Sequence, residues 1–278
     1  LFHPYETAPI NLRYSKYSHA QIIIEDTMKR LLLRLAFSFI AIGTYATAAE
    51  VNYYVIADQA RPFQIEQQGQ MHSGIVTDIV SAIFAESDYQ VNYHTYPFKR
   101  MISILEEGGE PNWLTYGSPN WGKVQSENLS EEPIYTVKHV LVSSSEKPLE
   151  FKNMDTMHGR SIVLLLGFDY PNLIPFFEDG SVNEIRVKDY DAAYRVITRT
   201  PGDTAFVEME SRVMYNLKRL NLSLEDFQIQ SFSSVIPNYS IYLAFSPQMQ
   251  PETQDYINTR LAELKTSGEI DEIIQRYQ

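Results

Sequence analysis

The sequence contains no cysteine, which excludes disulfide bonds and any metal site built on thiolates. Histidine is also sparse, and the six histidines are scattered without a close pair at metal-ligand spacing. We therefore expect no metal and no other cofactor. Basic residues are fewer than acidic ones, 23 against 35, so the net charge is −12. Such an acidic chain repels phosphate backbones, and we expect no nucleic-acid partner.

An apolar run near the start of the chain, 35–43, is too short to span a bilayer. It follows the basic stretch 29–34, and behind it Ala46-Thr47-Ala48 fits the small-x-small rule of signal peptidase. We therefore expect residues 28–49 to be a signal peptide and residues 1–27 to be a spurious N-terminal extension. A buried amphipathic helix is the alternative interpretation, and the abrupt change to a strand pattern after this segment disfavours it.

Cleavage is expected near Ala48 or Ala49. No cysteine follows the cleavage site, so lipid anchoring at that point is excluded. We expect a freely diffusing periplasmic protein without a membrane anchor, and a monomer.

The next hundred residues alternate between strand and helix patterns. Strand-like runs at 51–57, 90–96 and 113–116 are separated by helical periodicity at 75–84 and 98–107. This β-α-β-α-β order predicts a mostly parallel sheet with crossover helices.

The alternation restarts after Lys147-Pro148. Strands are expected at 161–166, 184–188 and 204–207, and helices at 170–177, 190–198 and 209–220. A last strand, 241–245, and a long helix broken at Ser267-Gly268 are too small to fold alone. We expect this terminal section to pack on one of the two α/β units.

Five stretches in this order resemble one protein family. Residues 74–84 (GIVTDIVSAIF) are similar to its G-x-x-x-D-[IL] helix opening, and 129–135 (LSEEPIY) to its FSxPYY segment. Residues 158–171 (HGRSIVLLLGFDYP) resemble GKxVGVxxGTxYE, and 203–208 (DTAFVE) resemble DAAFxD. The segment from LAFSPQMQ to IIQRY, 243–277, is similar to the family's C-terminal pattern. The family is that of bacterial periplasmic solute-binding proteins serving polar amino acid uptake.

This resemblance implies a type II periplasmic-binding-protein fold. Such a fold has two α/β lobes, each a mostly parallel sheet flanked by helices, and two hinge crossings between them. Residues 50–137 and 238–278 would form lobe 1, and 138–237 lobe 2. The crossings would lie near 136–140 and 231–238. The ligand would occupy the crevice at the carboxyl ends of the strands.

Ten residues are implied as ligand contacts. In lobe 1 two aromatic side chains and hydroxyls gather where the 113–116 strand ends, beside a lone cation, and in lobe 2 a carboxylate ends a buried strand. The candidates are Phe63, Phe98, Arg100, Tyr116, Ser118, Trp121, Lys123, Phe168, Asp169 and Glu208. Glu208 stands where the family holds the ligand's amino group.

Several of these positions have a second interpretation. Lys123 stands where the family carries an arginine for the ligand's carboxylate, and a lysine offers only a point charge in place of a bidentate fork. Arg100 could supply that guanidinium or be a solvated cation. Phe98 could belong to the core, Phe63 could support the lobe, and Asp169 could cap a helix N-terminus.

The resemblance implies a binding protein rather than an enzyme. It would capture a small polar solute, an amino acid or a relative, and deliver it to the permease of a membrane ABC importer. Two alternatives remain open. The same fold could act as a dehydratase-type enzyme, with Glu208 and Lys123 as acid and base. It could also be a sensor or interaction module that binds no small molecule, with Tyr116, Trp121 and Phe168 filling the cleft.

Overall fold

The computed structural model describes residues 49–67, 72–122 and 124–277. The expected N-terminal extension and nearly all of the expected signal peptide therefore lie outside the described residues, and so does Lys123. Among the described helices, none has both the length and the apolar character needed to cross a membrane.

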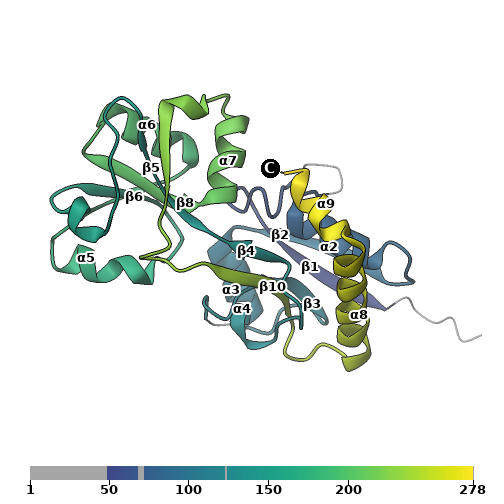
Figure 1. Ribbon diagram of the computed structural model, residues 1–278. Helices are drawn as coiled ribbons and strands as arrows, with labels where there is room; N and C mark the ends of the chain where they lie inside the picture. The colour runs from purple at the N-terminus through teal and green to yellow at the C-terminus, as the bar shows by residue number, and fades with distance from the viewer. Residues whose placement is uncertain (1–48, 68–71, 123, 278) are drawn as a thin grey trace, which may run out of the picture. The chain divides into compact units, whose positions relative to one another are not determined.

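The first of two five-stranded sheets has the order β2-β1-β3-β10-β4 (Figure 1). Strand β1 pairs in parallel with β2 and β3, whereas β10 pairs antiparallel with β3 and β4. Helices α2, α3, α4, α8 and α9 accompany this sheet (Figure 1). The strand bounds are Glu50–Ile56 for β1, Gln90–Tyr96 for β2, Trp113–Gly117 for β3, Tyr135–Val137 for β4 and Tyr239–Phe245 for β10. The helix bounds are Ile75–Phe84 for α2, Phe98–Glu106 for α3, Val124–Glu127 for α4, Pro251–Ser267 for α8 and Glu269–Gln275 for α9.

The contacts at the start of α2 explain the glycine and the aspartate of the G-x-x-x-D pattern, Gly74 and Asp78. Gly74 has a φ of 113°, and a Cβ on it would lie 2.7 Å from the carbonyl oxygen of Phe63. The hydroxyl of Tyr277 accepts a hydrogen bond from the Gly74 N–H at 2.8 Å and donates one to Asp78 at 2.7 Å. The C-terminal segment is thereby tied to the first helix of the same sheet, as expected for a terminal section that cannot fold alone.

The second sheet has the order β7-β6-β8-β5-β9. Strand β6 pairs in parallel with β7 and β8, whereas β5 pairs antiparallel with β8 and β9. The strand bounds are His139–Ser144 for β5, Ser161–Leu165 for β6, Asn183–Val187 for β7, Thr204–Met209 for β8 and Phe227–Ser231 for β9. The accompanying helices are α5 (Ile174–Glu178), α6 (Tyr190–Arg199) and α7 (Glu210–Arg219) (Figure 1).

The second sheet is buried on both faces. Val163 and Leu165 of β6 belong to one hydrophobic cluster, and the alternating Ile162 and Leu164 belong to another. The continuous apolar run of this strand predicted such two-sided burial. The first sheet is covered by one large cluster that also includes Ile257 of α8.

The chain passes between the two sheets twice. Lys138 alone separates β4 of the first sheet from β5 of the second, and residues 232–238 separate β9 from β10. This confirms the predicted fold class of two α/β units with two crossings. Within each sheet, the three strands of the β-α-β-α-β unit are parallel to one another. The strands next to the crossings pair antiparallel with their neighbours, so each sheet is mixed. The domain boundaries themselves stay a prediction.

Gly117, the last residue of β3, meets α4 at close range. A Cβ on Gly117 would lie 2.0 Å from the carbonyl oxygen of Gln125, which accepts a hydrogen bond from the Ser118 N–H at 3.0 Å. The Gly117→Ala variant is therefore expected to lose about 1–3 kcal/mol of unfolding free energy, because backbone must move to admit the methyl group. Urea denaturation measures this loss. Thr136→Ala, at an exposed position of β4, is the control, and an equal effect of the two would contradict the contact.

Candidate functional site

The candidate site is formed where parallel strands end. Phe63 follows β1, Phe98 opens α3 after β2, and Tyr116 lies near the end of β3. From the second sheet, Phe168 follows β6 and Glu208 lies next to the last residue of β8. The carboxyl ends of strands in open α/β sheets leave a crevice that commonly receives ligands. Residues of both sheets thus contribute to one site.

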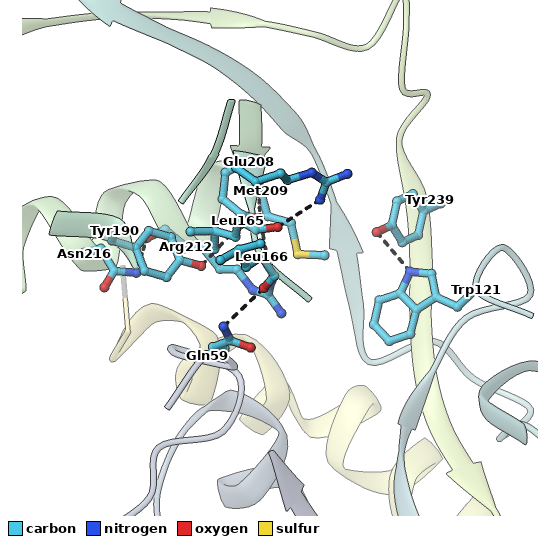
Figure 2. A network of polar contacts seen from close by, with 11 residues as sticks. Gln59, Trp121, Leu165, Leu166, Tyr190, Glu208, Met209, Arg212, Asn216 and Tyr239 are labelled. Atoms are coloured by element: carbon cyan, nitrogen blue, oxygen red, sulfur yellow. Dashed lines mark hydrogen bonds and ion pairs between the residues drawn. The ribbon is translucent and has the colours of Figure 1, made fainter. Parts of the chain in front are cut away.

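A buried ion pair lies at the centre of this site. Glu208 and Arg212 are 1% and 2% exposed, and Glu208 Oε1 lies 3.7 Å from Arg212 Nη1. Figure 2 shows the pair with the groups around it. The Met209 N–H donates to Glu208 Oε1 at 2.7 Å, and the Tyr190 hydroxyl donates to Oε2 at 3.3 Å. Because α7 begins at Glu210, directly after β8, Glu208 near the end of the strand and Arg212 in the first turn of the helix lie close together.

The Arg212 guanidinium lies against aromatic rings from both sheets. Its central carbon is 4.9 Å from the ring centroid of Phe168 and 5.7 Å from that of Phe63. Both distances fit cation–π attraction, which is strongest when the cation is desolvated. Its Nε is buried and has no hydrogen-bond partner among the described residues. The guanidinium is thus held by rings and by a carboxylate, with one donor unused.

Burial and mutual attraction act in opposite directions on the charges. Burial raises the pKa of Glu208, and Arg212, the Met209 N–H and the Tyr190 hydroxyl partly offset this rise. Burial by itself lowers the pKa of Arg212, but Tyr190, Glu208 and other neighbours outweigh it, so the pKa is raised. Arg212 therefore stays protonated, and Glu208 is the member of the pair whose charge is held less firmly.

Six of the ten predicted ligand residues lie together around this pair. The rings of Phe98 and Phe168 stack at 5.5 Å, those of Phe63 and Tyr116 at 6.0 Å, and Trp121 meets Tyr116 edge-on at 5.5 Å. Glu208 is the sixth. Phe98 therefore contacts the loop that follows β6 of the second sheet as well as packing against the core of the first. That these six bind a solute stays a prediction.

The remaining predicted residues have different surroundings. Arg100 is exposed on α3, and Lys123 lies outside the described residues. Ser118 is fully buried, and its hydroxyl donates to the Ser240 carbonyl oxygen at 2.8 Å. Asp169 is exposed, and the interpretation of Asp169 as a helix N-cap is wrong. The N-cap of the 3-10 helix Pro171–Leu173 is Tyr170, because the backbone turns one residue later.

Sequence reasoning missed Arg212, the cation at the centre of the site. A signal was present, because Arg212 lies between the apolar positions of α7 and precedes Val213, Asn216 and Leu217 on its buried face. It also follows Glu208 by four residues, across the junction between β8 and α7. Within the described ranges, no group of three or more His, Cys, Asp or Glu residues could hold a metal ion.

Two further contacts join the chain segments beside the site (Figure 2). Gln59 Nε2 donates to the Leu166 carbonyl oxygen at 3.3 Å. Trp121 Nε1 donates to the Tyr239 hydroxyl at 3.1 Å, and the Tyr239 ring lies 5.8 Å from that of His139. His139 and Tyr239 are the first residues of β5 and β10, so this group of rings lies where the chain passes between the sheets.

A family model described as bacterial extracellular solute-binding proteins, family 3, matches residues 54–278. The chain belongs to this family. The comparison with curated proteins returned no match. Among solved structures, this chain is similar to the substrate-binding protein of an amino acid ABC transporter, with 19% sequence identity and a TM-score of 0.62. The match covers 82% of this chain and 99% of the other.

Two more solved structures have the same fold. One comes from work on glutathione import via GshT and the cystine ABC importer TcyBC of Streptococcus mutans, with 19% identity, a TM-score of 0.67 and coverage of 83% and 95%. The other is an ABC uptake transporter substrate-binding protein from Streptococcus pneumoniae with bound histidine, with 14% identity, a TM-score of 0.62 and coverage of 83% and 92%. At these identities the similarity shows the type II fold.

The pH dependence of stability is expected to report on His139. Its burial, with a smaller contribution from Arg212, lowers its pKa from 6.5 to about 4. The unfolded chain then binds the proton more readily, so folding stability is lost as the pH falls from about 6.5 toward 4. Between pH 7 and 5 the wild type should lose about 2 kcal/mol through this group, and His139→Gln should remove that loss.

Urea denaturation at both pH values, wild type against variant, measures this difference. His158→Gln, at an exposed histidine, is the matched control and should retain the wild-type pH dependence. An unchanged pH dependence in His139→Gln would show that the His139 ring is not desolvated.

Removing one member of the buried pair should destabilise the protein more than removing both. Glu208→Gln and Arg212→Met are each expected to cost about 3–5 kcal/mol at pH 7.5, because each leaves its partner without compensation. The double variant leaves no buried charge, so its cost should fall well below the sum of the two single costs. Additive costs in urea denaturation would show that the two side chains are not coupled.

Proposed function

We propose that this family 3 protein captures a small polar solute bearing an acidic group and delivers it to the permease of an ABC importer. The observation that carries the proposal is the enclosed Glu208–Arg212 pair, held between rings that follow strands of both sheets. Arg212 offers a cation with an unused donor, and several aromatic side chains surround it. Such groups orient a small ligand in an otherwise apolar site. Neighbours described as amino acid transporter proteins support this class of solute.

Binding would proceed by closure of the two α/β units about the crossing segments. Residue 138 and residues 232–238 are the places where backbone dihedral changes can swing one sheet relative to the other. Opening requires the Gln59–Leu166 hydrogen bond and the Phe98–Phe168 stack to part, because each joins the two units. The solute would enter between them and meet Arg212.

The protein is proposed to act as a monomer in the periplasm, after cleavage of the signal peptide at 28–49, and to catalyse no reaction. Its membership in an extracellular solute-binding family supports this location and this role. Phe63, Phe98, Tyr116, Trp121 and Phe168 would pack against the solute, and Arg212 would have the role of carboxylate-binding cation for which the sequence suggested Lys123 or Arg100.

One observation favours a second candidate, a sensor or interaction module without a small-molecule ligand. Phe63, Tyr116, Glu208 and Arg212 are each at most 2% exposed, and the chain's own atoms cover them. A site filled by its own side chains is an expected property of a fold that has lost solute binding. The same burial is equally expected for a binding protein in its closed conformation.

A thermal-shift screen of the purified protein with small polar solutes decides between these candidates. The panel should hold the amino acids, their deaminated acids, their decarboxylated amines and short dicarboxylates. A true solute at 100 times its Kd adds about 2.7 kcal/mol to stability, which is a clear rise in Tm. Tyr215→Phe, a change on the outer part of α7, is the control for a folded protein with an unaltered site.

Stabilisation by at least one solute supports a binding protein. No stabilisation by any member of the panel, with a cooperative unfolding transition, would contradict the proposed function and favour the ligand-free module. Chromatography of the incubated solutes completes the test, because turnover of an acid would assign the chain to the dehydratase-type alternative.

A further inference from the structure

The proposed function leaves open which charged groups of the solute are recognised. Arg212 and Glu208 are both candidates, one for an acid and one for an amine. Their contacts differ, however, in how much hydrogen-bonding capacity each has left. The following inference rests on the proposed function and concerns this difference.

Each carboxylate oxygen of Glu208 already has a hydrogen-bond partner within the chain. One carboxylate oxygen accepts the Met209 N–H at 2.7 Å and faces Arg212 at 3.7 Å, while the other accepts the Tyr190 hydroxyl at 3.3 Å. Its negative charge is also balanced, because Arg212 lies beside it and is almost as deeply buried. A solute amine would therefore have to share the carboxylate with these partners and with Arg212.

Arg212, in contrast, has capacity to spare. The 3.7 Å separation from Glu208 is too long for a hydrogen bond, and the side-chain hydrogen bond with Tyr116 uses only part of the five N–H donors of the guanidinium. The Nε donor is buried without a partner. A buried donor without an acceptor costs free energy, and an incoming carboxylate would relieve this cost with a charge-assisted bond.

An ammonium group is disfavoured next to Arg212. It would be a second positive charge in a site whose single carboxylate is already paired, and like charges in a desolvated site repel strongly. The surrounding rings offer no further anion: Phe63 and Phe168 face the guanidinium, and Phe98 stacks on Phe168. The buried Nε donor of Arg212 lacks an acceptor, which a solute carboxylate supplies and an ammonium group does not.

We propose that the solute is a small carboxylic acid recognised by Arg212, and that no amino group is needed for its binding. Glu208 then acts as a positioning residue that orients Arg212, and the rings of Phe63, Phe98 and Phe168 receive the apolar part of the acid. This departs from amino acid recognition, in which a carboxylate of the protein holds the amine.

Matched trios of solutes test this by isothermal titration calorimetry on the full chain. One trio is 3-phenylpropanoate, L-phenylalanine and 2-phenylethylamine; the other is 4-methylpentanoate, L-leucine and isopentylamine. In the trio whose apolar part fits, the acid should bind at least tenfold tighter than the amine. The amino acid should bind no tighter than the acid.

Variants then assign the interaction to the guanidinium. Arg212→Met should weaken binding of the acid at least tenfold, and Arg212→Lys should restore part of it. Arg219→Met, at an exposed arginine two turns further along α7, is the matched control and should change the affinity less than twofold. If Arg212→Met does not fold, the ranking within each trio still decides, because it uses the wild-type protein.

An amino acid that binds more than tenfold tighter than its deaminated acid would overturn the inference and leave the proposed function standing. Binding confined to the amines of the wider panel would overturn the inference and also the acidic group in the proposed function. Failure of every solute to bind would instead overturn the proposed function. An unchanged affinity in a folded Arg212→Met variant would overturn the role of Arg212.

Discussion

The buried contact between Glu208 and Arg212 is the constraint on which the rest of the site depends. Taking two charges out of water costs several kcal/mol for each ion, and attraction between them offsets this only with good geometry and further hydrogen bonds. Met209 and Tyr190 supply bonds to the carboxylate, and the rings of Phe63 and Phe168 cover the guanidinium. The loops after β1 and β6 are thus fixed by the need to cover one cation.

The topology explains why this pair can be shared by two sheets. In both sheets the carboxyl ends of the parallel strands lie at the site. In a β-α-β-α-β unit, the loops that follow these strands lie at the same edge of the sheet. The antiparallel strands β4, β5, β9 and β10 carry the chain from one sheet to the other next to that edge. The rings of His139 and Tyr239 meet where β5 and β10 begin, and Tyr239 contacts Trp121, so ring contacts run from the crossings to the site.

The periodicity of apolar residues in the sequence was sufficient to predict the fold class, because the pattern of buried positions determines which segments form helices and strands. The apolar spacing of 75–84 and the continuous run at 161–165 predicted α2 and β6 closely, whereas the half-exposed β9 and the four-residue α4 were missed. The site was harder to predict. Ser118 is engaged by Ser240, a residue 122 positions away, through pairing of β3 with β10 that no local pattern reveals. Arg212 was overlooked because arginine is seldom fully buried.

A site covered by its own side chains sets a condition on any solute. The conformation that admits a solute must separate Phe98 from Phe168 and Gln59 from Leu166. If only a fraction of the molecules has this open conformation, the apparent affinity falls to that fraction of its intrinsic value. Opening also returns water to the Glu208–Arg212 pair, which relieves part of its desolvation cost. The pair therefore favours opening while the rings favour closure. A solute that satisfies the free donor of Arg212 shifts this balance toward the closed state, because it supplies the acceptor that the enclosed guanidinium lacks.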